Sequence, residues 1–172
     1  NGHMDVVKWI HATKPDVELS TNGDVILRDA CRAGNMDLVQ WIFQTKPHMV
    51  VYNVEEGFRA ACASGQLEVA KHLMDTYVPL KKVIEYNDAF RLATYGDHYD
   101  TAEWLTTVAP SISLPALNDA FFHACRNGDL RMAKWLVDYS QEISVVSGDD
   151  RAFKAACKGR HVDVARWLVS VS

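Results

Sequence analysis

The chain has 172 residues, 48% of them hydrophobic and 23% charged, a composition typical of folded globular proteins and not of disordered ones. Its formal net charge of −4 argues against a general attraction to nucleic acid or to anionic membranes. No apolar run follows a basic start, and no stretch of about 18 apolar residues occurs, so neither a secretory signal nor a membrane span is expected. We therefore expect a cytoplasmic or nuclear protein.

A repeat of 31 or 32 residues organises the sequence. Tryptophan recurs at this spacing, with a histidine in the one gap, at Trp9, Trp41, His72, Trp104, Trp135 and Trp167. A second series with the same period consists of Cys31, Cys62, Thr94, Cys125 and Cys157. A third, in the same register, consists of Leu27, Phe58, Phe90, Phe121 and Phe153. Three series that share one period indicate stacked repeat units.

The clearest copy of the unit spans residues 57–73. Phe58, Ala61 and Cys62 have the spacing of one face of a helix, and Gly65 provides a positive-φ stop after it. Apolar residues at helical spacing then recur over residues 67–73. Each unit is therefore predicted to be a helix–turn–helix of about 18 residues, joined to the next unit by a connector of about 13 residues.

In chain order, the pattern predicts a half repeat over residues 1–13, followed by five units that start near residues 24, 56, 87, 118 and 150. We expect residues 1–172 to form a single repeat domain. Neither end resembles the polar cap that solenoids normally carry, so the chain is interpreted as a fragment of a longer array or as a protein that pairs end to end. The sequence leaves its oligomeric state open.

Polar residues mark the predicted starts of the first helices. Three pairs stand where their side chains would cap free amide groups, Asn87-Asp88, Asn118-Asp119 and Asp149-Asp150. The turn inside the units has glycine in some copies and a larger residue in others: Gly34, Gly65 and Gly128, but Asp97 and Arg160. Because Gly96 and Gly159 stand one place earlier, we expect the turn to be rebuilt locally in those two units.

The four cysteines all occupy one position of the repeat. Adjacent helix layers are about 8–10 Å apart, whereas a disulfide needs Cα atoms within about 7 Å, and ligands in different layers do not converge on zinc. We therefore predict four buried free thiols. The seven histidines have no metal or catalytic spacing, and no nucleophile elbow or phosphate-binding loop occurs. No cofactor, metal, small-molecule substrate or catalytic residue is expected.

The unit resembles the ankyrin repeat. That family's first helix reads Thr-Pro-Leu-His-x-Ala-Ala-x-x-Gly, and Phe58, Ala61, Cys62 and Gly65 stand at its Leu, Ala, Ala and Gly positions. The resemblance covers nearly the whole chain, although the Thr-Pro pair is absent and only Asn22-Gly23-Asp24 is similar to the family's hairpin turn. It implies an all-α, right-handed solenoid of stacked helix-turn-helix units, with β-hairpins reduced or absent, that binds a partner.

Two positions four residues apart on the predicted first helices are mostly basic or aromatic. They are occupied by Arg28, Arg32, Arg59, Arg91, Tyr95, Phe122, Arg126, Lys154 and Lys158. Stacking would align them into one ridge, the basic ridge, with Asp29, Leu92 and His123 beside it. First helices line the concave binding surface of ankyrin proteins, so the resemblance makes this ridge the candidate partner-binding surface. The alternative is an ordinary solvated helix face.

The leading hypothesis is a protein–protein interaction scaffold without catalytic activity. Its partner is expected to be another protein, and the basic ridge favours an acidic one. The alternative is a structural spacer of a longer repeat protein, in which no face is special. Nucleic-acid binding by the ridge is disfavoured because aromatic residues do not alternate regularly with the basic ones and the net charge is negative. Membrane binding and enzymatic activity are not expected.

Overall fold

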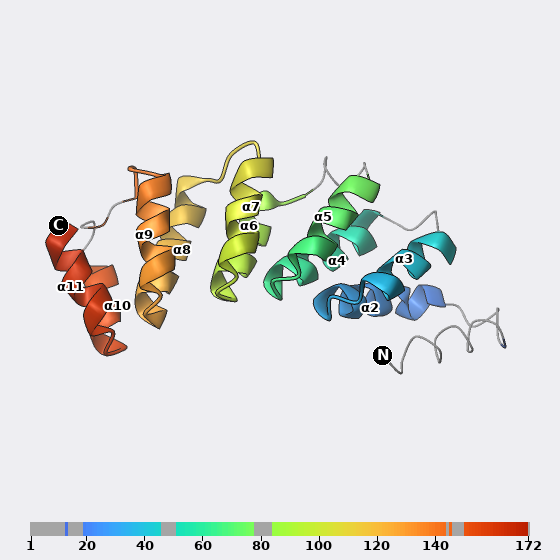
Figure 1. Cartoon of the computed structure of the whole chain (residues 1–172), viewed down its shortest axis with the longest axis horizontal. Helices are drawn as coiled ribbons and strands as arrows, with labels where there is room; N and C mark the ends of the chain where they lie inside the picture. The colour runs from blue at the N-terminus through green and yellow to red at the C-terminus, as the bar shows by residue number, and fades with distance from the viewer. Residues whose placement is uncertain are drawn as a thin grey trace. The chain divides into compact units, whose positions relative to one another are not determined.

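The computed structural model describes residues 13, 19–45, 51–77, 84–143, 145 and 150–171. Its helices are α2 (Leu19–Arg32), α3 (Met36–Thr45), α4 (Val51–Ala63), α5 (Leu67–Thr76), α6 (Tyr86–Tyr95), α7 (Tyr99–Val108), α8 (Leu114–Asn127), α9 (Leu130–Tyr139), α10 (Arg151–Lys158) and α11 (Val162–Val171) (Figure 1). These residues include no strand, and the hairpin-like sequence Asn22-Gly23-Asp24 lies inside α2. The protein is therefore an all-α repeat solenoid, as predicted. Residues 1–12 of the predicted half repeat lie outside the described part.

The helices form pairs along the chain, and each pair is a helix–turn–helix unit. Contacts divide the chain into two compact units, one of Asn1–Ala61 with Gln66–Ile84 and one of Cys62–Gly65 with Glu85–Ser172. In the first compact unit, Gly57 of α4 lies against side chains of α2. In the second, α8 packs against both α6 and α10. Successive first helices are thus neighbours within each compact unit.

Three of the first helices begin earlier than the unit starts predicted from the sequence. Helix α2 begins at Leu19 instead of near 24, α4 at Val51 instead of near 56, and α8 at Leu114 instead of near 118. The cause is visible at α8, where Ser113 is the N-cap and its Oγ accepts a hydrogen bond from the Ala116 amide at 3.4 Å. Residues assigned to the connector therefore belong to the helix.

Two of the three predicted capping pairs consequently lie inside helices and not before them. Asn87-Asp88 and Asn118-Asp119 lie inside α6 and α8, and Asp150 precedes α10 without a side-chain cap bond, whereas Asp149 lies outside the described residues. Asn87 instead accepts a hydrogen bond from the Ser113 amide at 2.8 Å. This bond ties α6 to the start of the following pair.

The core repeats from pair to pair, because the phenylalanines of α6 and α8 each lie against a tryptophan of the next pair. The rings of Phe90 on α6 and Trp135 on α9 have centroids 6.3 Å apart, and those of Phe121 on α8 and Trp167 on α11 are also 6.3 Å apart. Both phenylalanines are buried, which contributes about 1.5–3 kcal/mol each. The fully buried Ala93 gives α6 a small residue at its packed face. These tryptophans are packing residues, as predicted.

The turn inside each pair keeps one backbone conformation, contrary to the expectation that two copies are rebuilt. Gly34, Gly65 and Gly128 have φ angles of 69°, 67° and 83°. Asp97 and Arg160 adopt the same left-handed conformation, with φ of 59° and 62°. Such a conformation costs a residue with a Cβ about 1–2 kcal/mol, so the surrounding structure must hold these two in place.

Glycine is needed in the other copies because a residue of the next turn occupies the space that a side chain at this position would fill. A Cβ at Gly34 would overlap the amide of Gln66, and a Cβ at Gly128 would overlap the ring of His161. The turn that follows Asp97 has the shorter Asp129 at the corresponding place, where its carboxylate accepts a hydrogen bond from Met132 N at 2.9 Å. A residue with a side chain can thus stand at the turn position when the next turn has a shorter residue beside it.

Only three of the four cysteines are buried, so the prediction of four buried thiols is wrong for Cys157. Cys125 lies on α8, which α10 covers, whereas Cys157 lies on α10 and no described residue buries it. Burial raises the pKa of Cys31 and of Cys125 to about 12, and it raises the pKa of Cys62 as well.

We expect Gly128→Ala to lower the free energy of unfolding by about 1–2 kcal/mol or more, because alanine is strained at this φ and its Cβ would overlap His161. Arg160→Gly, at the same position of the repeat, is the control and should leave stability unchanged or raise it. Urea unfolding followed by circular dichroism measures both. An alanine variant as stable as the parent protein would refute the steric explanation.

We also expect a thiol reagent to modify Cys157 rapidly in the folded protein and to reach Cys31, Cys62 and Cys125 only after denaturation. The thiolate is the reactive species, and burial suppresses its formation at the other three sites. Mass spectrometry after brief labelling identifies the modified residue, and Cys157→Ser should remove the fast phase. Rapid modification of any buried cysteine would contradict this assignment.

Candidate functional site

The basic ridge was predicted to run along the first helices, and its first members lie on α2 and α4. Each of these arginines has a carboxylate beside it. Arg32 Nη1 lies 2.9 Å from Asp29 Oδ1, Arg28 Nε lies 3.8 Å from the same oxygen, and Arg59 Nε lies 4.0 Å from Glu56 Oε1. Exposed pairs of this kind contribute about 0–1 kcal/mol to stability, but they reduce the net positive charge of this part of the ridge.

Arg91 on α6 is compensated in the same way, and it also connects two helix pairs. Its Nη1 lies 3.2 Å from Asp88 Oδ1 on the same helix, and its Nε lies 3.3 Å from Asp119 Oδ2 on α8. Because two carboxylates neutralise its guanidinium, Arg91 is poorly placed to pair with an acidic group of a partner. Its ion pairs indicate a structural role between α6 and α8.

Tyr95 and His123 form an aromatic contact between α6 and α8 next to this ion pair. Their rings are stacked with centroids 4.3 Å apart, and Tyr95 is exposed. Burial lowers the pKa of His123, Arg126 lowers it further and Asp97 opposes the shift. The lowered pKa favours the uncharged form of the His123 ring, which stacks on Tyr95.

The remaining residues of the ridge lie around an open hollow of about 500 Å³ between α8 and α10. It is lined by Phe122 and by four cationic side chains, which we name the cation cluster: Arg126, Arg151, Lys154 and Lys158. The guanidinium carbon of Arg151 lies 4.9 Å from the centroid of the Phe122 ring. None of the four forms an ion pair with another residue of the described ranges.

Arg151 was not among the predicted ridge residues, although the repeat contains the signal for it. It stands at the position that Glu56, Asp88 and Asp119 occupy in the preceding units. In those units the carboxylate at this position pairs with an arginine of the ridge. The last unit thus replaces an acidic counter-ion by a cation, and this replacement makes the cation cluster unlike the rest of the ridge.

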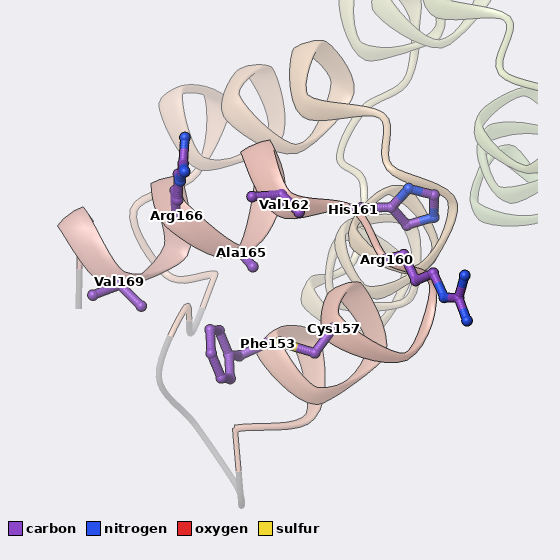
Figure 2. A pocket seen from close by; sticks show the side chains of 8 residues that line it. All are labelled: Phe153, Cys157, Arg160, His161, Val162, Ala165, Arg166 and Val169. Atoms are coloured by element: carbon purple, nitrogen blue, oxygen red, sulfur yellow. The ribbon is translucent and has the colours of Figure 1, made fainter.

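A second surface, which the sequence analysis did not predict, is an apolar hollow of about 590 Å³ that we name the α10–α11 groove (Figure 2). Phe153 and Cys157 project from α10 on one side, and Ala165 and Val169 from α11 on the other. Arg160 lies at the end of the groove where the turn joins the two helices. No acidic residue lines it among the residues that the structure describes.

Neither surface contains a cluster of metal-binding side chains as far as the described ranges extend. They contain no group of three or more His, Cys, Asp or Glu side chains that could hold a metal ion. Among the same residues, no helix combines the length and apolar character needed to cross a bilayer.

A family model described as ankyrin repeats (many copies) matches residues 121–169. The matched segment runs from the middle of α8 to α11 and includes the turns at Gly128 and Arg160. No curated protein matches the chain. The helix–turn–helix unit with its left-handed turn residue also recurs before this segment, at Gly34, Gly65 and Asp97. Residues 121–169 thus match the ankyrin-repeat family, and the preceding units repeat the same helix–turn–helix arrangement.

Proposed function

We propose that this chain is a protein–protein interaction scaffold without catalytic activity and that the cation cluster binds an acidic segment of its partner. Ankyrin repeats generally mediate protein–protein interactions, and such proteins are typically not catalysts. We further propose that residues 1–172 act as one ankyrin-like repeat domain in the cytoplasm or nucleus. The binding role, the partner and the compartment are all part of this proposal.

The observation that carries the proposal is the concentration of uncompensated positive charge between α8 and α10. The protein as a whole has a net charge of −4, yet Arg126, Arg151, Lys154 and Lys158 surround one hollow that no carboxylate of the described residues lines. A local charge that opposes the net charge of the molecule attracts one class of partner and repels the opposite class. Phe122 adds an aromatic surface on which an apolar side chain of the partner can lie.

The proposal restricts the binding surface to the last part of the basic ridge, between α8 and α10. Arg28, Arg32, Arg59 and Arg91 have carboxylates within 4.0 Å, so binding an acidic partner there would first require those pairs to separate. The cations between α8 and α10 need no such exchange. Tyr95 and His123 are proposed to extend the contact surface as stacked rings next to the cluster.

The main alternative is a structural spacer in which no face is special, and the second is a nucleic-acid-binding surface. The spacer hypothesis does not account for the replacement of the carboxylates at the Arg151 position by a cation. Nucleic acid would require aromatic residues interleaved with the cations, whereas Phe122 is the one aromatic ring among the described residues that line this hollow.

We predict that Arg126→Glu combined with Lys154→Glu and Lys158→Glu weakens binding of a glutamate-rich peptide at least about tenfold, equivalent to about 1.4 kcal/mol. Fluorescence anisotropy of the labelled peptide measures the Kd at two salt concentrations, because binding by exposed charges falls with salt. The matched control reverses Arg28, Arg32 and Arg59, whose charges are already paired.

Equal losses in the two triple variants would show that overall charge and not the cluster governs binding. Unchanged binding in the Arg126, Lys154 and Lys158 variant would refute the proposed site. Tighter binding of single-stranded RNA than of the peptide would favour the nucleic-acid alternative. Circular dichroism of both variants verifies that the exposed substitutions leave the helices intact.

A further inference from the structure

The hollow between α8 and α10 differs by two replacements from the corresponding space between α6 and α8. In that earlier interface, the ring of Tyr95 is stacked on the ring of His123, with centroids 4.3 Å apart. One unit later, Arg126 stands at the position of Tyr95, and Ala155 stands at the position of His123. Both of these residues line the hollow. The space that a histidine ring fills in one interface is therefore open in the next.

A second contact shows that the two interfaces are equivalent in three dimensions as well as in sequence. Arg91 Nε on α6 lies 3.3 Å from Asp119 Oδ2 on α8. At the same two positions one unit later stand Phe122 and Arg151, and the guanidinium carbon lies 4.9 Å from the ring centroid. A cation–aromatic contact thus replaces an ion pair at the same place. The helices meet in the same register, so the opening over Ala155 results from the side chains.

The arginine at the edge of this opening provides a flat surface for a ring. Arg126 is exposed and forms no ion pair with another residue of the described ranges. A guanidinium is planar and stacks on aromatic rings, which one arginine of this hollow already does. A ring placed over Ala155 would therefore lie against Arg126 as the ring of His123 lies against Tyr95.

The remaining residues of the lining favour an anionic group on that ring. Arg151, Lys154 and Lys158 surround the hollow, and no carboxylate of the described residues lines it. A phosphate monoester carries a charge of about −1.5 to −2 at neutral pH and accepts hydrogen bonds through three oxygens, so that one group can pair with several of these cations. A glutamate side chain has a smaller charge and no ring.

We propose that the hollow between α8 and α10 recognises a phosphotyrosine side chain of the partner protein. The ring lies over Ala155 against the guanidinium of Arg126, and the phosphate is bound by Lys154 and Lys158. This inference rests on the function proposed above, because it names the chemistry of the acidic segment that the cation cluster binds. Phosphorylation of a tyrosine in the partner would then strengthen the interaction.

A nucleotide also combines a flat ring with phosphate, but the hollow does not complement a base. The amino groups of adenine, guanine and cytosine are hydrogen-bond donors. The side chains of the described lining residues are either apolar or themselves donors. A base would thus find no side-chain acceptor among them, whereas a phenyl ring needs none.

Three labelled peptides that differ at one residue test the proposal, with the Kd measured by fluorescence anisotropy. The central residue is phosphotyrosine, tyrosine or phosphoserine, and glutamates flank it in each peptide. We expect the phosphotyrosine peptide to bind about tenfold more tightly than either of the others, because it alone combines the ring with the phosphate. Phenyl phosphate should displace it at a lower concentration than inorganic phosphate or AMP.

Two variants of the protein remove the site for the ring without reversing a charge. Ala155→His places a ring where His123 has one in the preceding unit, and Arg126→Lys keeps the charge but removes the planar guanidinium. Each should reduce the preference for phosphotyrosine over phosphoserine to about twofold while the glutamate-rich peptide still binds. The matched control is Ala155→Ser, which should bind like the parent protein. Circular dichroism verifies that each variant is folded.

The proposal is overturned if phosphoserine or unmodified tyrosine binds as tightly as phosphotyrosine, or if either variant retains the full preference. AMP that displaces the peptide better than phenyl phosphate would assign the hollow to a nucleotide and would also overturn it. In these cases, continued binding of the glutamate-rich peptide leaves the function proposed above standing. Failure of both the glutamate-rich and the phosphotyrosine peptide to bind would refute that function and this inference together.

Discussion

The structure depends on one packing relation, in which the phenylalanine of a first helix is covered by the helix pair that follows it. A single pair cannot bury its apolar face alone, so stability in such arrays comes largely from the interfaces between neighbours. Phe90 with Trp135 and Phe121 with Trp167 are two instances of this relation. The Asn87 hydrogen bond to Ser113 and the ion pair of Arg91 with Asp119 fix the polar edges of the same interface.

This packing relation also explains why residues at the same position of the repeat differ in burial and in reactivity. A cysteine on α8 is an inert core thiol with a pKa of about 12, whereas its counterpart on α10 is exposed beside an apolar hollow. Two charge changes coincide in the last unit: Arg151 replaces the carboxylates of earlier units, and Arg160 replaces the turn glycine or aspartate. Arg151 thus belongs to the cation cluster that we propose for binding, and Arg160 lies at the end of the α10–α11 groove.

Much of the fold could be predicted from the sequence because the period and the helical spacing are local properties. The positive φ of Gly65 and the burial of Cys62 follow from them. The left-handed Asp97 and Arg160 could not be predicted, because tertiary packing overrides the preference of these residues. The exposure of Cys157 could not be predicted either, because it depends on whether another helix pair covers α10. The basic ridge was predicted from residue types and their positions in the repeat. The ion pairs that distinguish its first part from the cation cluster become visible only in the structure.

The most direct test of the central claim compares one substitution at two equivalent positions of the repeat, Phe121→Ala and Phe153→Ala. Phe121 is covered by the next pair and is 3% exposed, while Phe153 is 37% exposed. Equilibrium urea unfolding should show a loss of about 3–5 kcal/mol for Phe121→Ala, as is typical of a buried phenylalanine. The loss for Phe153→Ala should be clearly smaller. Equal losses at the two positions would contradict the claim that coverage by the next helix pair determines what each repeat residue contributes.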